Sequence, residues 1–209
     1  MSVTYKEIYL QTESFKSVKE DFNNVFEIVD KVFANGKDSF KEVIFTGCGS
    51  SLYLAQSAAA VFTKYTGVST KAVACSEIYF YPELYIGKEA TLVVPFTRKS
   101  TTTEVQMAIK KARSFANVKS LSITCDGGSA EYNDYMILSA NAAEDSVVMT
   151  RSYTSMLYIA TAMAMYLGGD DSYGNLVLID VDVHILVHAT QEKAIRKYLL
   201  SLPLDEKQL

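Results

Sequence analysis

Short apolar runs rich in β-favouring residues alternate with amphipathic stretches along most of the chain. The runs predict strands, and the stretches repeat their apolar residues at helical spacing. Alternation at short intervals is typical of βαβ units, which build a parallel sheet covered by helices on both faces. We therefore expect an α/β fold, a three-layer αβα sandwich with a five-stranded, mostly parallel sheet. Strands are predicted at 42–46, 70–74, 91–96, 118–125 and 135–140, and helices at 6–33, 52–66, after 104 to about 115, and 152–167.

The stretch Val43–Ser57 combines a buried strand, a glycine turn and the start of a helix. Gly47 and Gly49 permit backbone angles and close approach that a Cβ would forbid. The first helical turn presents N–H groups and a dipole that favours an anion, and Ser50 and Ser51 add hydroxyl donors. The pattern indicates an anion site, with a plain strand–turn–helix joint as the alternative.

A second polar loop, residues 97–104, follows the third predicted strand and also leads into a helix. Its small hydroxyl residues are denser than helix capping requires, and Arg98 and Lys99 add positive charge. Both loops are predicted at the carboxyl edge of the sheet, where ligands bind in such folds. This convergence favours a phosphate site over a solvated turn.

Composition limits the classes of partner. Of 209 residues, 49% are hydrophobic and 21% charged, the net charge is −4 and the pI is about 5.3. An acidic chain argues against nucleic acid as a main partner, and no apolar run is long enough to span a membrane. Cys48, Cys75 and Cys125 have no zinc-site or disulfide spacing, which favours a reducing, cytoplasmic setting.

Four stretches together resemble one known family. They are TYKEIYLQTES at 4–14, GCGSSLYLAQSAA at 47–59, ACSEIYFYP at 74–82 and EDSVVMTRSYTSML at 144–157. The likeness is to the sugar isomerase (SIS) domain family, in particular the isomerase half of glucosamine-6-phosphate synthase and the tagatose-6-phosphate ketose/aldose isomerases. The resemblance implies a flavodoxin-like domain that binds a phosphorylated sugar or amino sugar, without a metal or an organic cofactor, in a homodimer.

The resemblance also implies which residues form the site. In this sequence Lys99 replaces a family serine, Ser100 a glycine and Thr101 a glutamate, so phosphate binding is expected in altered form. The expected phosphate-binding residues are Ser50, Ser51, Thr97, Lys99, Ser100 and Thr102, and the expected sugar-binding residues are Gly49, Arg98 and Val147.

No catalytic residue is matched by the resemblance. Isomerisation needs a base, for which Glu144 and Glu77 are the candidates, whereas Glu104 is expected to support its helix N-terminus. His184 and His188 are expected in core or surface positions. Two hypotheses remain open: an isomerase or deaminase of sugar or amino-sugar phosphates, and a non-catalytic sensor or dimerising remnant.

The expected organisation has three parts. Residues 1–35 form a helical leader, 36–169 the SIS domain, and 170–209 a strand–helix tail. The tail resembles a fragment of a second SIS domain, in which Tyr173 stands where the family has a histidine proposed to open the sugar ring. The apolar helix 152–167 could be core or a subunit contact.

Overall fold

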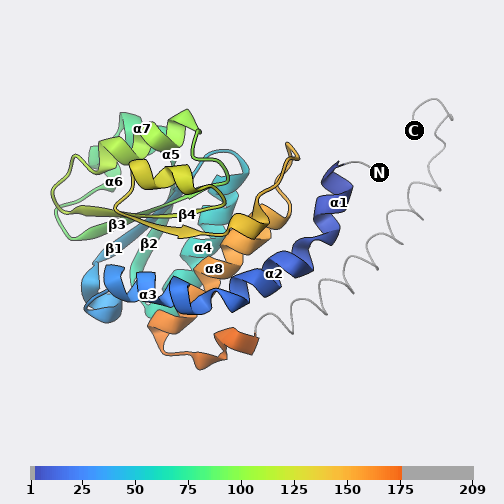
Figure 1. The fold of residues 1–209 in the computed structure, drawn as a ribbon. Coiled ribbons are helices and arrows are strands. Elements are labelled where there is room, and N and C mark those ends of the chain that lie inside the picture. The colour runs from blue at the N-terminus through green and yellow to red at the C-terminus, as the bar shows by residue number, and fades with distance from the viewer. Residues whose placement is uncertain (1–2, 176–209) are drawn as a thin grey trace, which may run out of the picture. The chain divides into compact units, whose positions relative to one another are not determined.

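Five parallel strands form the central sheet in the part of the chain that the structure describes. A computed structural model describes residues 3–175 (Figure 1). The strand order is β2-β1-β3-β4-β5, and every neighbouring pair is parallel. The predicted fold class is confirmed, with all five strands parallel where the sequence indicated mostly parallel ones. The strands are β1 (Glu42–Gly47), β2 (Ser69–Ala74), β3 (Thr91–Thr97), β4 (Val118–Thr124) and β5 (Tyr135–Leu138).

The central strands read as continuous apolar runs because helices cover both of their faces. Val43, Ile44 and Phe45 of β1 are fully buried, as is every residue of β3. Phe45 stacks on Phe96 of β3 with ring centroids 5.9 Å apart. A half-solvated strand would have needed polar residues at every second position.

Helices form the outer two layers (Figure 1). One face carries α4 (Ser50–Thr66) and α8 (Arg151–Gly168), which pack against each other. The other carries α5 (Cys75–Phe80), α6 (Pro82–Tyr85) and α7 (Thr103–Ala112). The tyrosine- and phenylalanine-rich segment after β2, for which the sequence predicted no element, is helical. Ten residues of α8 are buried, which places this helix in the core.

The leader forms three helices and not the single helix predicted over 6–33. They are α1 (Val3–Tyr9), α2 (Gln11–Glu20) and α3 (Phe22–Val32). Asp21 closes α2, since its N–H bonds to the carbonyls of Ser17 and Val18. The breaks between these helices let both α2 and α3 pack against α8. The ring of Phe22 lies 5.3 Å from the ring of Tyr158, measured between centroids. The leader thus belongs to one compact unit with the domain, which extends to Gly174.

Four short 3₁₀ segments complete the described chain. Tyr173 lies in the last of them and packs its ring edge-on against Phe26, with centroids 4.8 Å apart. The rest of the predicted tail, including His184 and His188, lies outside the described residues. The segments are η1 (Gly36–Ser39), η2 (Gly127–Glu131), η3 (Ala140–Ala142) and η4 (Asp171–Asn175).

The chain changes direction across the sheet at β1. This strand pairs with β2 on one side and with β3 on the other. The loops that follow β1 and β3 therefore leave the same sheet edge side by side and lead to helices on opposite faces. Such a switch point opens a crevice at the carboxyl ends of the strands, where α/β proteins bind ligands.

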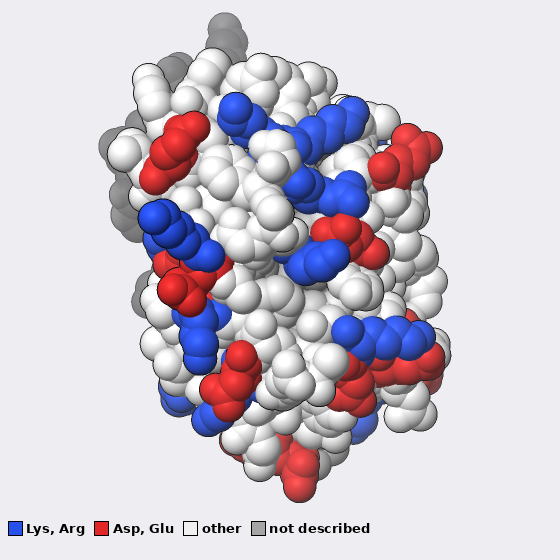
Figure 2. Space-filling view, turned by 90° about the vertical axis from the view of Figure 1, so that its left-hand side faces the viewer, with Lys and Arg blue, Asp and Glu red and all other residues white. Residues whose placement is uncertain are grey.

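One face of the molecule carries both signs of charge. Figure 2 shows this face, on which acidic and basic side chains are scattered among larger uncharged regions. A nucleic-acid surface would need basic side chains gathered along one stripe. Within residues 3–175, no helix combines the length and apolarity that a membrane crossing requires.

Candidate functional site

Two glycines shape the first loop, residues 46–51. Gly49 adopts φ 56° and ψ −125°, a left-handed conformation that disfavours any side chain, and it directly precedes α4. A Cβ on Gly47 would lie 2.6 Å from the carbonyl carbon of Ser51. Both glycines are thus needed to fold β1 tightly into the start of α4. The turn places Ser50 and Ser51 in the first turn of a 17-residue helix.

The second loop, residues 97–102 in the structure, closes around the carbonyl oxygen of Lys99. The Thr97 hydroxyl donates to this oxygen at 2.7 Å, and the Thr102 hydroxyl donates to it at 3.1 Å. Ser100 turns away, because its N–H and its hydroxyl both donate to a carboxylate oxygen of Asp126, at 3.3 and 2.9 Å. The loop is thereby fixed before α7 begins at Thr103.

Asp126 follows β4 and anchors this second loop from the neighbouring strand. Its other carboxylate oxygen accepts the Gly128 N–H at 2.9 Å. The hydrogen bonds from Gly128 and from the Ser100 hydroxyl, with a smaller contribution from the charge of Lys99, lower the pKa of Asp126. Asp126 is therefore an anionic support of the loop.

The two loops enclose a cavity of about 200 Å³ at the switch point. Its walls combine hydroxyl groups, two cationic side chains and apolar groups. Such a mixture suits a small ligand with an anionic group. The lining residues are Cys48, Ser51, Phe96, Thr97, Arg98, Lys99, Thr101, Thr102, Val105 and Met149.

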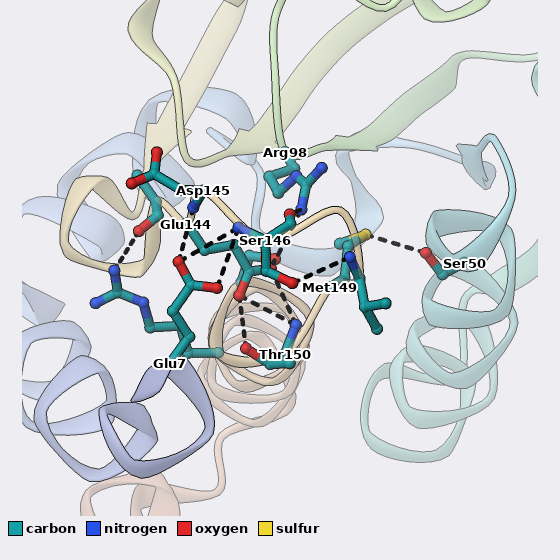
Figure 3. A network of polar contacts seen from close by, with 12 residues as sticks. Glu7, Ser50, Arg98, Glu144, Asp145, Ser146, Met149 and Thr150 are labelled. Carbon is teal, nitrogen blue, oxygen red and sulfur yellow. Dashed lines mark hydrogen bonds and ion pairs between the residues drawn. The ribbon is translucent and has the colours of Figure 1, made fainter. Parts of the chain in front are cut away.

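A third segment, loop 144–150, borders this cavity through Met149 and rests on two buried carboxylates (Figure 3). Glu7 of α1 accepts the N–H of Asp145 at 2.7 Å and the N–H of Ser146 at 3.2 Å. Glu144 accepts the N–H and the hydroxyl of Thr150, and the hydroxyl of Ser152. The first carboxylate fixes the start of the loop, and the second fixes its end at the N-terminus of α8.

Arg98 links the second loop to loop 144–150. One guanidinium nitrogen donates to the carbonyl of Ser146 at 2.5 Å and lies 3.6 Å from a carboxylate oxygen of Glu144. The Arg98 side chain is 19% exposed, so it offsets the buried charge of Glu144 while still lining the cavity. This ion pair and the hydrogen bond to Ser146 hold the second loop and loop 144–150 together beside the cavity.

Several of the predicted site residues come together in the structure. Ser51, Thr97, Arg98, Lys99 and Thr102 line the same cavity. Ser50 lies beside them, with its hydroxyl 3.1 Å from the sulfur of Met149.

The other predicted residues lie apart from the lining. Ser100 faces Asp126, Gly49 shapes the turn, and Val147 is 92% exposed at the tip of loop 144–150. Glu77 lies on α5 and accepts the Tyr85 hydroxyl at 3.0 Å. Glu144 is buried and occupied by hydrogen bonds to the backbone and hydroxyls.

Reasoning from sequence missed Glu7, Asp126 and Met149. Glu7 stands in the leader motif, and Asp126 follows a predicted strand just as the two loops do, so both positions carried a signal. Met149 carried none, because its sulfur reaches the first loop across 99 residues of sequence.

The thiols beside the site differ in their environments. A hydrogen bond with Cys75 lowers the pKa of Cys48, and the same hydrogen bond, together with burial, raises the pKa of Cys75. Burial raises the pKa of Cys125 to about 12. All three are free cysteines. In the described part of the chain, no cluster of three or more His, Cys, Asp or Glu side chains could hold a metal ion.

Known proteins are similar to this chain in sequence or in structure. D-galactosamine-6-phosphate deaminase AgaS of Shewanella sp. (strain ANA-3) is 27% identical over 196 residues, covering 88% of this chain and 50% of the relative. The structure of tagatose-6-phosphate ketose/aldose isomerase from Escherichia coli matches with a TM-score of 0.71 at 18% identity, covering 87% of this chain and 54% of that one.

The C-terminal domain of glucosamine-fructose-6-phosphate aminotransferase from Francisella tularensis also has a TM-score of 0.71, at 20% identity, with 91% of this chain and 56% of that one covered. The chain thus spans about half the length of the deaminase relative that it matches. Residues 39–166 match the model of the SIS domain. The resemblance predicted from four motifs is confirmed, and the chain belongs to the SIS domain family.

Proposed function

We propose that the cavity between the two loops binds the phosphate group of a phosphorylated sugar or amino sugar. The observation on which this rests is that Ser51, Thr97, Lys99 and Thr102 line one cavity beside the N-termini of α4 and α7. Helix N-termini favour anions, and hydroxyls with a lysine suit phosphate oxygens. The relatives named above, which act on or are named for sugar 6-phosphates, support this choice of ligand.

The proposed reaction class is isomerisation or deamination of a sugar or amino-sugar phosphate. Both include a proton transfer at carbon in the open-chain sugar, which needs a base. Within residues 3–175 the cavity lining contains no carboxylate and no histidine. Glu144 and Glu77 remain the candidate bases, and Glu144 would have to exchange hydrogen bonds to act. Ligand binding is therefore the main part of this proposal, and the reaction class depends on it.

We infer a cytoplasmic homodimer as the setting of this function, with neither nucleic acid nor membrane as a partner. The free cysteines suit a reducing compartment. Exposed apolar side chains on α5 and α6 and the turn between them offer a subunit contact, with Phe80 67%, Tyr81 60% and Leu84 74% exposed. Light scattering coupled to size exclusion measures the oligomeric state, and a strictly monomeric chain would remove this part of the proposal.

Calorimetric titration tests the binding proposal. The ligands are glucosamine 6-phosphate, galactosamine 6-phosphate, fructose 6-phosphate, tagatose 6-phosphate and inorganic phosphate. Ser51→Ala and Thr102→Ala should each weaken binding by about 1 kcal/mol, because each removes one hydroxyl that would donate to phosphate. To do so, Thr102 turns its hydroxyl from the Lys99 carbonyl, and Ser51 turns its hydroxyl from the Met149 sulfur. Ser57→Ala is the matched control, since Ser57 lies exposed on α4 and donates to the carbonyl of Tyr53.

Two outcomes separate the functional alternatives. Exchange of the C2 proton of a bound ligand into deuterated water, followed by NMR, identifies catalysis. Binding without exchange identifies the non-catalytic sensor. An absence of binding at millimolar concentration of every ligand would overturn the phosphosugar proposal.

A further inference from the structure

The sulfur of Met149 lies within hydrogen-bonding distance of both serine hydroxyls of the first loop. Figure 3 shows its contact with Ser50. Ser50 donates its hydroxyl to this sulfur at 3.1 Å, and Ser51 donates at 3.7 Å. Met149 also lines the cavity between the two loops. A thioether is a weak hydrogen-bond acceptor, so these two contacts contribute little by themselves. The same two hydroxyls are the donors that the sequence assigns to phosphate.

The chain around Met149 is anchored on both sides, and its middle makes one local hydrogen bond, from the Val148 N–H to the Ser146 hydroxyl at 3.2 Å. Glu7 holds the N–H groups of Asp145 and Ser146, and Glu144 holds Thr150. Between these anchors Val147 is 92% exposed and Val148 is 61% exposed. The Met149 side chain can therefore leave the serine hydroxyls by rotation about its own bonds, with both anchors intact.

We propose that Met149 competes with the ligand's phosphate for the hydroxyls of Ser50 and Ser51, and so sets the affinity of the site. This inference rests on the proposed function. A phosphate oxygen is a charged acceptor and takes hydroxyl hydrogen bonds more strongly than a thioether. A methionine side chain has three rotatable bonds, so it can leave these hydroxyls at low conformational cost. Binding then requires Met149 to withdraw, and the residue discriminates against anions too weak to displace it.

Substitution separates this role from simple packing. Met149→Ala removes both the sulfur and its volume, and should tighten binding of inorganic phosphate and of the sugar phosphates about fivefold, the equivalent of one weak hydrogen-bonding competitor. Met149→Leu keeps the volume without the acceptor and should give a smaller gain. Met107→Ala is the matched control, because Met107 is 37% exposed on α7 and does not line the cavity.

Labelled methionine methyl groups report the movement directly. The Met149 signal, assigned by its loss in Met149→Ala, should shift on addition of inorganic phosphate and saturate at the calorimetric Kd. The Met107 signal should stay in place. Circular dichroism establishes that each variant is folded before it is titrated.

The outcomes separate this inference from the function on which it rests. If the wild-type chain binds sugar phosphate through Ser51, but Met149→Ala binds equally or more weakly, the competition is overturned and the proposed function stands. An unshifted Met149 signal at saturating phosphate overturns it as well. If neither chain binds any of the ligands, the proposed function is overturned, and this inference with it.

Discussion

The carboxylate of Glu7 accepts a hydrogen bond of 2.7 Å from the backbone N–H of Asp145, 138 residues further along the chain. The same carboxylate accepts the N–H of Ser146. Glu7 is buried, and its helix precedes the domain in sequence. The leader therefore contributes to the site by fixing the backbone of loop 144–150, which borders the cavity through Met149.

Replacing Glu7 by alanine should destabilise the fold and loosen loop 144–150. The substitution leaves the N–H groups of Asp145 and Ser146 without their acceptor, at a cost of about 1–3 kcal/mol. Urea unfolding measures the loss, and amide hydrogen exchange locates it in the loop. Glu13→Ala is the control, since Glu13 is exposed on α2. Equal unfolding midpoints for Glu7→Ala and wild type would contradict the anchoring role.

The sequence predicted the parts of this site that are encoded locally. The strand–glycine–serine pattern around Gly49 predicted β1, its turn and the start of α4, because each step depends on neighbouring residues. The alternation of elements also predicted that the loops after β1 and β3 share one sheet edge.

Contacts between distant segments were beyond such reasoning. Arg98 meets the carbonyl of Ser146 across 48 residues, and the Ser50 hydroxyl meets Met149 across 99. Neither pairing leaves a periodic signal, since each depends on how loop 144–150 folds back over the sheet edge. The breaks within the leader were missed for the same reason, because packing against α8 decides where those helices turn.

Gly49→Ala should destabilise the first loop and weaken ligand binding. At φ 56° and ψ −125° a side chain is strained, at a cost of about 1–3 kcal/mol. The strain would be relieved by moving Ser50 and Ser51, which disturbs the donors proposed for phosphate. Thermal unfolding and phosphate titration measure the two effects.

Gly87→Ala is the control for Gly49→Ala, because a Cβ on Gly87 meets nothing within 4 Å. An alanine at position 49 that left both the melting temperature and the phosphate affinity unchanged would show that the turn tolerates a side chain. The positive φ of Gly49 would then be needed neither for stability nor for phosphate binding.

Glu144→Ala should destabilise the chain more than Glu144→Gln. Alanine removes the acceptor of Thr150 and Ser152 and leaves Arg98 without its buried counter-charge, at about 3 kcal/mol. Glutamine retains one acceptor oxygen and the side-chain volume. Urea unfolding gives the ranking, with the exposed Glu131→Ala as control.

The same pair of variants separates structural from catalytic roles for Glu144. If Glu144 acts as a base on the ligand, Glu144→Gln should lose C2-proton exchange even where the variant is folded and still binds sugar phosphate. If Glu144→Gln retains both stability and exchange, the carboxylate is needed for neither role.

Asp126 should make the second loop sensitive to acid. The hydrogen bonds from Gly128 and Ser100 hold its pKa below the value in the unfolded chain, about 3.9. For a depressed pKa, the stabilisation is fully present above the unfolded value and is lost as pH falls through the folded one. Wild type should therefore exceed Asp126→Asn in unfolding free energy at pH 7, and the difference should shrink as the pH falls below about 4.

The difference in unfolding free energy between wild type and Asp126→Asn reports the contribution of Asp126 alone. Other acids with lowered pKa values, such as Asp134, titrate alike in both proteins and cancel. Urea unfolding at pH 7, 5, 4 and 3 measures it, with Asp38→Asn, at an exposed position in η1, as the control. A difference that stayed constant from pH 7 to pH 3 would show that the carboxylate charge of Asp126 does not hold the loop. Phosphate affinity followed over the same range above pH 4 should fall in Asp126→Asn, because asparagine keeps a single acceptor oxygen for both Ser100 and Gly128, which loosens the turn between Thr97 and Thr102.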